Sequence, residues 1–235
     1  MGVLAFAWPF VAPNLFPGSS LHQRDAPVFL VAMLVCIAGV LFLDLSRGLG
    51  PKTVALLGVL GAAMVALRLP GFVSGFSAMF IIVLVGGNAF GPSFGFLLGA
   101  LGTFASGLFV GGLGPWLPFQ MVSVGWVGLG AGLLPRRQGR MRIASLAAYG
   151  LVSGYVFGVV INLWSWPFTT IGSSIGWAAD GSLALNLRHY AAYYAATSFV
   201  WDTFRAVGNA AMVICVGAPL LKALDRAAIR MQVGR

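Results

Sequence analysis

Long apolar runs dominate this chain, and few charged residues separate them. Charged residues make up only 8% of the 235 residues, whereas about a quarter of an average soluble domain is charged. A helix needs about 20 apolar residues to cross a bilayer. Because backbone amides inside a bilayer must be satisfied within their own segment, we predict an all-α integral membrane protein, a bundle of about seven transmembrane helices.

Clusters of glycine and proline separate the predicted spans. The third and fourth runs meet at Gly91-Pro92, where we predict a tight reversal over residues 88–93, with Asn88 as a turn residue. The predicted spans cover residues 28–45, 53–69, 72–90, 91–110, 115–134, 143–166 and about 199–221.

Lysine and arginine are unequally divided between the two sides of this bundle. With the loop 135–142 in the cytoplasm, ten basic residues fall inside and three, Arg24, Arg68 and Arg188, fall outside. Cytoplasmic loops of membrane proteins carry such an excess. We therefore predict a multi-pass plasma-membrane protein with an extracellular N-terminus and a cytoplasmic C-terminus. The formal charge of +9 then reflects orientation in the lipid bilayer, and nucleic acid is not a predicted partner.

Tryptophan and tyrosine gather on the predicted outer side. This asymmetry has two interpretations, an aromatic belt at the lipid headgroups or a one-sided aromatic lining for a ligand. Because a belt is expected at both faces, the asymmetry favours the ligand. The residues are Trp116, Trp164, Trp166, Trp177, Trp201, Tyr190, Tyr193 and Tyr194.

Two outer connections add polar groups to these rings. The longer, about residues 167–198, is predicted as a loop and carries Arg188, His189, Tyr190 and Tyr193. The shorter, residues 111–120, is dense in glycine and proline. It presents Trp116 and Gln120 to a ligand or is simply a tight turn between helices.

The last span opens with ionisable residues on one helix face. Asp202, Arg205 and Asn209 follow Trp201 at helical spacing. Ionisable residues inside a membrane face a cavity or each other, so this face is either a polar wall of a pocket or a structural ion pair. Asn162, near the outer end of the sixth span, is predicted to face the same cavity.

Small residues repeat at four-residue spacing in three spans, a pattern that lets helices approach closely in membranes. Most of these grooves must be internal contacts, and an additional one is a docking face. They comprise Gly58, Ala62 and Ala66 in the second span, Gly91, Gly95, Gly99, Gly102 and Ser106 in the fourth, and Gly125, Gly128, Gly130 and Gly132 in the fifth.

Motifs for catalysis are missing from the sequence. It has no glutamate, no H-E-x-x-H and no nucleotide-binding P-loop, so neither a metal site nor a cofactor is predicted. We predict no enzyme, and active transport by this chain would need an external motor. The rival hypotheses are a membrane structural or assembly protein without a ligand, and a membrane enzyme with an unrecognised nucleophile.

Three glycine-rich stretches, residues 90–99, 111–121 and 125–134, resemble the substrate-binding S component of energy-coupling factor (ECF) transporters. The alanine-rich second span, which leads into Arg68-Leu69-Pro70, and the last span also resemble that family, and the likeness covers about residues 53–225. Family members have six helices and cytoplasmic termini. Residues 1–50 are then an N-terminal tail plus one extra transmembrane helix, and residues 51–235 are a six-helix binding domain with a cytoplasmic tail.

The resemblance also implies partners and a ligand. Small residues on the first family helix dock a transmembrane coupling subunit, which implies this role for Gly58, Ala62 and Ala66. Two cytoplasmic ATPase subunits drive the cycle, during which the S component topples in the membrane. A vitamin-type substrate binds near the outer face, under loops that correspond to residues 68–76, 110–120 and 166–194. Cobalamin or a precursor is the first candidate, and riboflavin-like or other vitamins remain open.

These arguments define one predicted substrate site at the extracellular side. Its residues are Trp116, Gln120, Asn162, Trp166, Arg188, His189, Tyr190, Tyr193, Trp201, Asp202, Arg205 and Asn209.

Overall fold

The computed structural model of the chain describes residues 6, 10, 50–69, 75–111, 113–114, 116–169, 173–178 and 181–232. Within these ranges the chain forms seven α-helices, one π-helical turn and no strand, which confirms the predicted all-α bundle. The predicted span at residues 28–45 lies outside the described part. The helices are α3 (Pro51–Arg68), α4 (Met79–Phe90), α5 (Pro92–Ser106) with the π-helical turn η2 (Gly107–Gly111), α6 (Leu117–Leu133), α7 (Gly139–Thr169), α8 (Leu183–Thr197) and α9 (Phe199–Gln232).

Four described segments are long and apolar enough to cross a membrane. They are Pro51–Arg68, Pro92–Val110, Gly139–Pro167 and Phe199–Arg230, whereas α4 and α6 are shorter apolar helices. The predicted span 72–90 is wrong in its first part, because α4 begins only at Met79 and is about 18 Å long. Gly75 has a φ of 84°, and its Cα packs against the backbone of Trp201, so this stretch cannot continue the helix.

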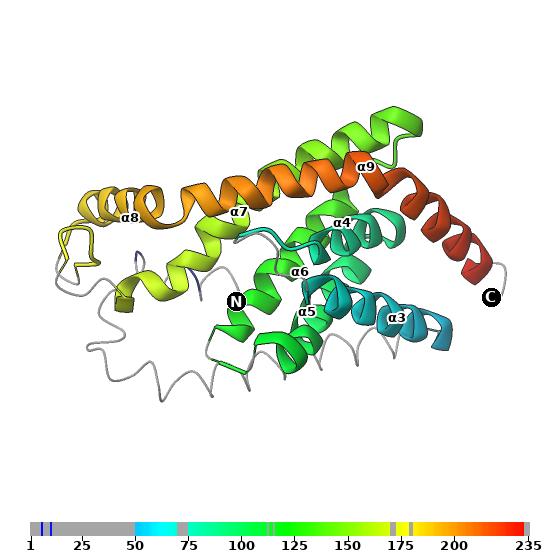
Figure 1. The fold of residues 1–235 in the computed structure, drawn as a ribbon, viewed down its shortest axis with the longest axis horizontal. Coiled ribbons are helices and arrows are strands. Elements are labelled where there is room, and N and C mark those ends of the chain that lie inside the picture. The colour runs from blue at the N-terminus through cyan, green and yellow to red at the C-terminus, as the bar shows by residue number, and fades with distance from the viewer. Residues whose placement is uncertain are drawn as a thin grey trace.

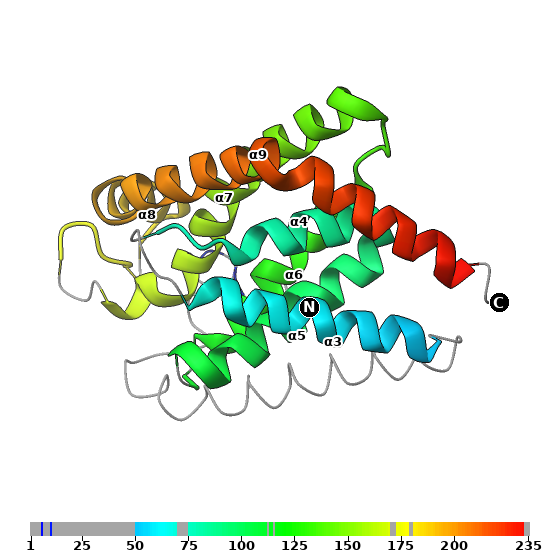
Figure 2. The same cartoon turned by 45° about the vertical axis from the view of Figure 1, so that its right-hand side comes forward.

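Helix α4 forms the centre of the bundle. In Figures 1 and 2 it lies between α3 and α9, and it also contacts α5 and α6. Every residue from Met79 to Ala89 is buried. A helix that is apolar on all sides can be surrounded by other helices, and α4 is therefore the core around which the others pack.

A sharp reversal joins α4 to α5, as the sequence predicts. Helix α4 ends at Phe90, Gly91 adopts a φ of 101°, and Pro92 begins α5. Asn88, however, is a buried helical residue rather than a turn residue. The left-handed conformation of one glycine is sufficient to turn the chain, so no polar side chain is needed there.

Helices α7, α8 and α9 differ from the predicted boundaries. Helix α7 begins at Gly139 rather than at residue 143, and α9 continues to Gln232 rather than ending near residue 221. The predicted outer loop 167–198 contains the 15-residue helix α8, whose first turn is capped by the Ser182 hydroxyl, 3.2 Å from the Leu185 amide. The tyrosines of this segment lie on a helix, because Ser182 provides a good N-cap and alanine and leucine favour helix.

Candidate functional site

The two ends of the bundle differ in the side chains that they carry. One end combines the start of α3, the start of α7 and the end of α9; the other combines the end of α7, α8 and the start of α9. Lysines and arginines line two grooves at the first end: Lys52, Arg140, Arg142, Lys222, Arg226 and Arg230. We call it the basic end and the opposite one the aromatic end. This grouping agrees with the predicted orientation, in which the basic end is cytoplasmic.

Hydrogen bonds tie the helices together at the basic end. Arg142 forms a bidentate ion pair with Asp225, with N–O distances of 2.6 and 3.1 Å, and its Nε donates to Asn88 Oδ1 at 2.7 Å. Asn88 Nδ2 donates to the Ala131 carbonyl at 3.2 Å. The network therefore connects α4, α6, α7 and α9. The sequence does not predict this network, because its members lie more than 40 residues apart along the chain.

A cluster of buried rings fills the aromatic end. Trp166 is fully buried, its ring centroid lies 5.0 Å from that of Tyr190, and its Nε1 donates to the Ile175 carbonyl at 3.0 Å. Tyr193 packs beside Tyr190 with a centroid distance of 6.2 Å. Three of the predicted site residues are thus brought together, but as mutual packing partners that are almost completely buried.

The aromatic packing continues from α8 to the start of α6. Phe119 packs 5.6 Å from Trp164, and Leu163 contacts both this group and the Trp166 cluster. Phe6 and Phe10, from the N-terminal segment, add rings against Phe119 and Trp166. The sequence does not predict these two contacts, since nothing local distinguishes Phe6 and Phe10 from other apolar residues.

Two neighbouring polar residues of α8 hold the segment 173–178 rather than point outward. Asn186 bonds to both the amide and the carbonyl of Ala178 at 2.9 Å, and His189 Nδ1 lies 2.6 Å from the Gly176 carbonyl. Arg188 is exposed. Of these two predicted site residues, His189 therefore stabilises the segment 173–178, while Arg188 is available to solvent or ligand.

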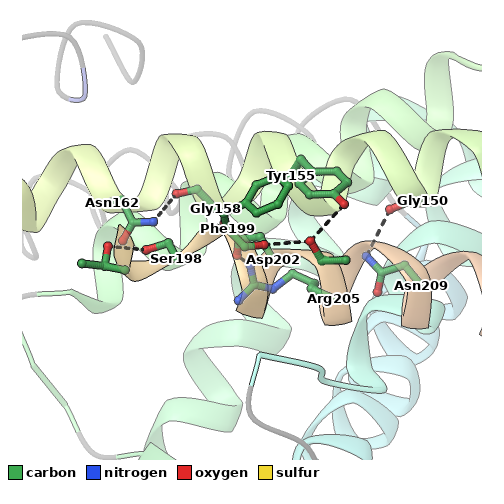
Figure 3. Close-up of polar contacts among 11 residues, drawn as sticks. Gly150, Tyr155, Gly158, Asn162, Ser198, Phe199, Asp202, Arg205 and Asn209 are labelled. Carbon is green, nitrogen blue, oxygen red and sulfur yellow. Dashed lines mark hydrogen bonds and ion pairs between the residues drawn. The ribbon is translucent and has the colours of Figure 1, made fainter. Parts of the chain in front are cut away.

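The polar face of α9 packs against α7, and Figure 3 shows these contacts. Asp202 pairs with Arg205 and lies directly against Gly158, while Asn209 Nδ2 donates to the Gly150 carbonyl at 3.3 Å. Both Asp202 and Asn209 are almost completely buried. These positions match the structural interpretation of the ion pair, in which polar groups fix the helix against its neighbour.

Other parts of this polar face bond locally or to aromatic rings. Asn162 donates to the Gly158 carbonyl of its own helix at 2.8 Å. The Arg205 guanidinium lies 4.8 Å from the centroid of the Phe157 ring, a distance typical of cation–π contact. The sequence pattern identified the shared face of Asp202, Arg205 and Asn209 but not the glycines of α7 that receive it.

Arg68 forms a second polar centre at the end of α3. Its guanidinium donates to Ser106 Oγ at 2.6 Å and to Gln120 Oε1 at 3.3 Å, joining α3, α5 and α6. The sequence predicts Arg68 on the outer side, at the start of a loop near the substrate, and Gln120 as a ligand contact, but not the hydrogen bond between them. Because Gln120 lies on helix α6 and not in the predicted loop, its amide is held in a fixed position.

Two of the predicted site residues are exposed tryptophans on separate elements. Trp116 is 39% exposed just before α6, and its ring covers Gly114. Trp201 is 47% exposed at the start of α9 and packs beside Phe204. Unlike Trp166, both rings have free surface for a planar partner.

The small-residue groove on α3 faces away from the bundle. Gly58, Ala62 and Ala66 are all exposed, and a side chain at Gly58 would meet no atom of the described residues within 4 Å. The opposite face of α3, with Leu57, Leu60 and Met64, is buried. In the grooves of α5 and α6, in contrast, Gly95 and Gly99 lie against α6, Gly102 lies against Met64 of α3, and Gly130 lies against Tyr149 of α7, so both grooves make internal contacts, as predicted.

Comparison with protein families gives one match. The family described as "ECF transporter, substrate-specific component" matches residues 52–217, which is most of the chain. Comparisons with curated proteins and with solved structures give no match.

Proposed function

The chain belongs to the family of substrate-specific components of ECF transporters, and from this premise we propose that it captures a vitamin-type ligand at its aromatic end. Cobalamin or a cobalamin precursor is the first candidate. The observation that carries the proposal is a pair of aromatic clusters, Phe119 with Trp164 and Trp166 with Tyr190, which Leu163 joins. Beside them Arg68 and Gln120 supply polar groups. Pockets for small molecules combine apolar walls with a few fixed polar groups in this way.

The predicted site residues divide into two proposed roles. Trp116, Trp201, Arg188 and Gln120 have accessible surface, and in our proposal they contact the ligand directly. The remainder support them from the packed interior. The supporting residues are Asn162, Trp166, His189, Tyr190, Tyr193, Asp202, Arg205 and Asn209.

Uptake requires partners, because the chain has no nucleotide-binding motif of its own. The family associates with an ECF module of ATPases and a coupling subunit. We propose that the transmembrane coupling subunit docks on Gly58, Ala62 and Ala66, because this groove is open and lets another helix approach closely. The alternative of an assembly protein without a ligand is favoured by no contact in the described residues.

Ligand binding is tested with the full chain purified in detergent. We expect cobalamin or a corrinoid precursor to raise the melting temperature more than riboflavin does. Gln120→Ala is expected to weaken binding about 10-fold, the effect of losing one hydrogen bond, and Trp116→Ala more, because exposed aromatic residues dominate binding sites. Gln138→Ala, an exposed glutamine in the loop before α7, is the matched control and should leave affinity unchanged.

The outcomes separate the parts of the proposal. A larger shift with riboflavin contradicts the corrinoid assignment alone. No shift with any vitamin contradicts the ligand class, while co-purification with a coupling subunit would still support the role in an ECF complex.

A further inference from the structure

A groove of about 900 Å³ runs between the first turns of α7 and the last turns of α9 at the basic end. Along α9 it extends from Ile214 to Ile229, which corresponds to about 22 Å of helix. One leaflet of a bilayer, from its midplane to the headgroups, is about 20–22 Å thick. The groove therefore has the length of one lipid leaflet.

The wall of this groove is apolar towards the middle of the bundle, and towards the end it combines charged side chains with the apolar Leu221 and Ile229. Towards the middle of the helices it is lined by Ile143, Ala147, Ile214 and Ala218. Towards the end of the bundle the lining includes four cations and a single carboxylate. These are Arg140, Arg142, Lys222 and Arg226, with Asp225.

The single carboxylate is already neutralised. Asp225 accepts two hydrogen bonds from Arg142, so this pair adds little net charge to the groove. Arg140, Lys222 and Arg226 pair with no carboxylate among the described residues. The end of the groove therefore carries an excess of positive charge directly beside an apolar channel.

We propose that this groove binds one anionic phospholipid, with its phosphate at Arg140 and Lys222 and an acyl chain along Ile143, Ala147 and Ala218. Basic pockets between transmembrane helices bind anionic headgroups on the cytoplasmic side, and the apolar channel matches the tail. A protein partner would have to supply both an anionic group and an apolar segment in the same order along the membrane normal. Every anionic phospholipid has an anionic headgroup followed by apolar acyl chains, and phospholipids surround the protein in the membrane.

The test uses the full chain, purified and delipidated in neutral detergent, and native mass spectrometry with added phosphatidylglycerol or phosphatidylcholine. We expect one phosphatidylglycerol per chain, bound at least about 10-fold more tightly than phosphatidylcholine. A basic side chain in direct contact with the phosphate is expected to contribute about fivefold to binding, whereas an exposed one outside the groove is screened by salt and contributes less. Arg140→Gln with Lys222→Gln should therefore weaken phosphatidylglycerol binding by about 25-fold.

The matched control removes the same charge from the same end but outside the groove. Arg137 and Arg230 are exposed and do not line it. Arg137→Gln with Arg230→Gln is expected to weaken binding less than about threefold. Equal weakening by both double variants, or equal binding of the two lipids, would show a diffuse attraction to the surface and overturn the proposal.

A second variant tests the apolar part without a change in charge. Ala218 is exposed and lines the groove, whereas Ala148 is exposed on α7 outside it. Ala218→Phe should fill the channel and reduce retained phosphatidylglycerol several-fold, and Ala148→Phe should not. Unchanged melting temperatures of all variants show that they fold.

Other occupants give distinct results. If the coupling subunit fills the groove, Ala218→Cys will cross-link to that subunit in the assembled complex and phosphatidylglycerol will be lost on assembly. If a second copy fills it, the mass spectrum will show a dimer that excludes lipid. Either result overturns the proposal.

Discussion

Two grooves of small residues have the same spacing in the sequence and opposite positions in the structure. On α5, Gly95 and Gly99 lie against α6 so closely that a side chain on either would overlap the backbone of Gly128 or Val124. On α3, Gly58 and Ala62 face outward, and no atom in the described part of the chain lies within 4 Å of a side chain added at Gly58. The four-residue spacing therefore predicts close approach of a helix, but it does not identify the helix.

The difference arises from what each helix presents on its other faces. The buried face of α3 carries Leu60 and Met64, and Met64 packs against Gly102 of α5. With that contact α3 is fixed in the bundle and its small-residue face is left open. Helix α6 has its own glycines facing α5, so there two backbones meet directly. Van der Waals packing of close backbones is a main source of helix association in membranes.

The largest loss of stability is expected from a substitution that overfills the contact between α5 and α6. In Gly128→Ala the new methyl group would overlap the carbonyl oxygen of Gly95, and α6 would have to move away from α5. Overpacking of this kind costs about 3 kcal/mol. Thermal or denaturant unfolding of the purified protein should show this loss.

Gly58→Ala is the matched control for that experiment. It adds the same methyl group where no described residue comes within 4 Å, so the free energy of unfolding should stay within about 0.5 kcal/mol of the parent value. Similar destabilisation by both substitutions would mean that the α3 groove is closed in the isolated chain.

A smaller loss is expected at the contact between α7 and α9. In Gly158→Ala the methyl group meets the Asp202 side chain rather than backbone, so rotation of the carboxylate relieves part of the overlap. We expect a loss of about 2 kcal/mol. In a double-mutant cycle, Asp202→Ala should remove much of that penalty, because the overlapping atoms are gone. Additive losses would show that the two residues are not in contact.

The smallest effect on the isolated chain is expected from Ala62→Leu. The side chain is exposed, so the free energy of unfolding should change by no more than about 0.5 kcal/mol. If the groove docks the coupling subunit as proposed, the same substitution will prevent co-purification of that subunit. Normal assembly would move the docking face elsewhere on the protein.

The sequence predicted several residues of the candidate site, but it did not predict which partners they contact. Helical spacing correctly placed Asp202, Arg205 and Asn209 on one face, because that spacing is a property of the helix itself. It could not indicate that Gly150 and Gly158 of α7 would receive them. The sequence places the tyrosines of α8 in the correct segment, but it predicts a loop there and the structure has a helix.

Partners that are distant in the chain could not be predicted. Arg68, Ser106 and Gln120 come from three helices, and nothing local in any of them indicates the other two. The position of Asn88 shortly before Gly91-Pro92 predicts a turn residue, yet its side chain donates a hydrogen bond to the Ala131 carbonyl and accepts one from Arg142. Both groups illustrate that a polar residue in a membrane helix needs a partner, and that the fold selects the partner.

The sequence by itself determined that this protein is a helical membrane bundle with few charges and a strongly basic side, because apolar length and charge distribution act locally along the chain. The matched family follows from the sequence as well. The tertiary structure alone decided that Gly95 and Gly99 of α5 close on α6 while Gly58 of α3 stays open, and that Arg140 and Lys222 line the same groove. Packing depends on which helix faces compete for the same neighbour, and this competition involves residues far apart in sequence.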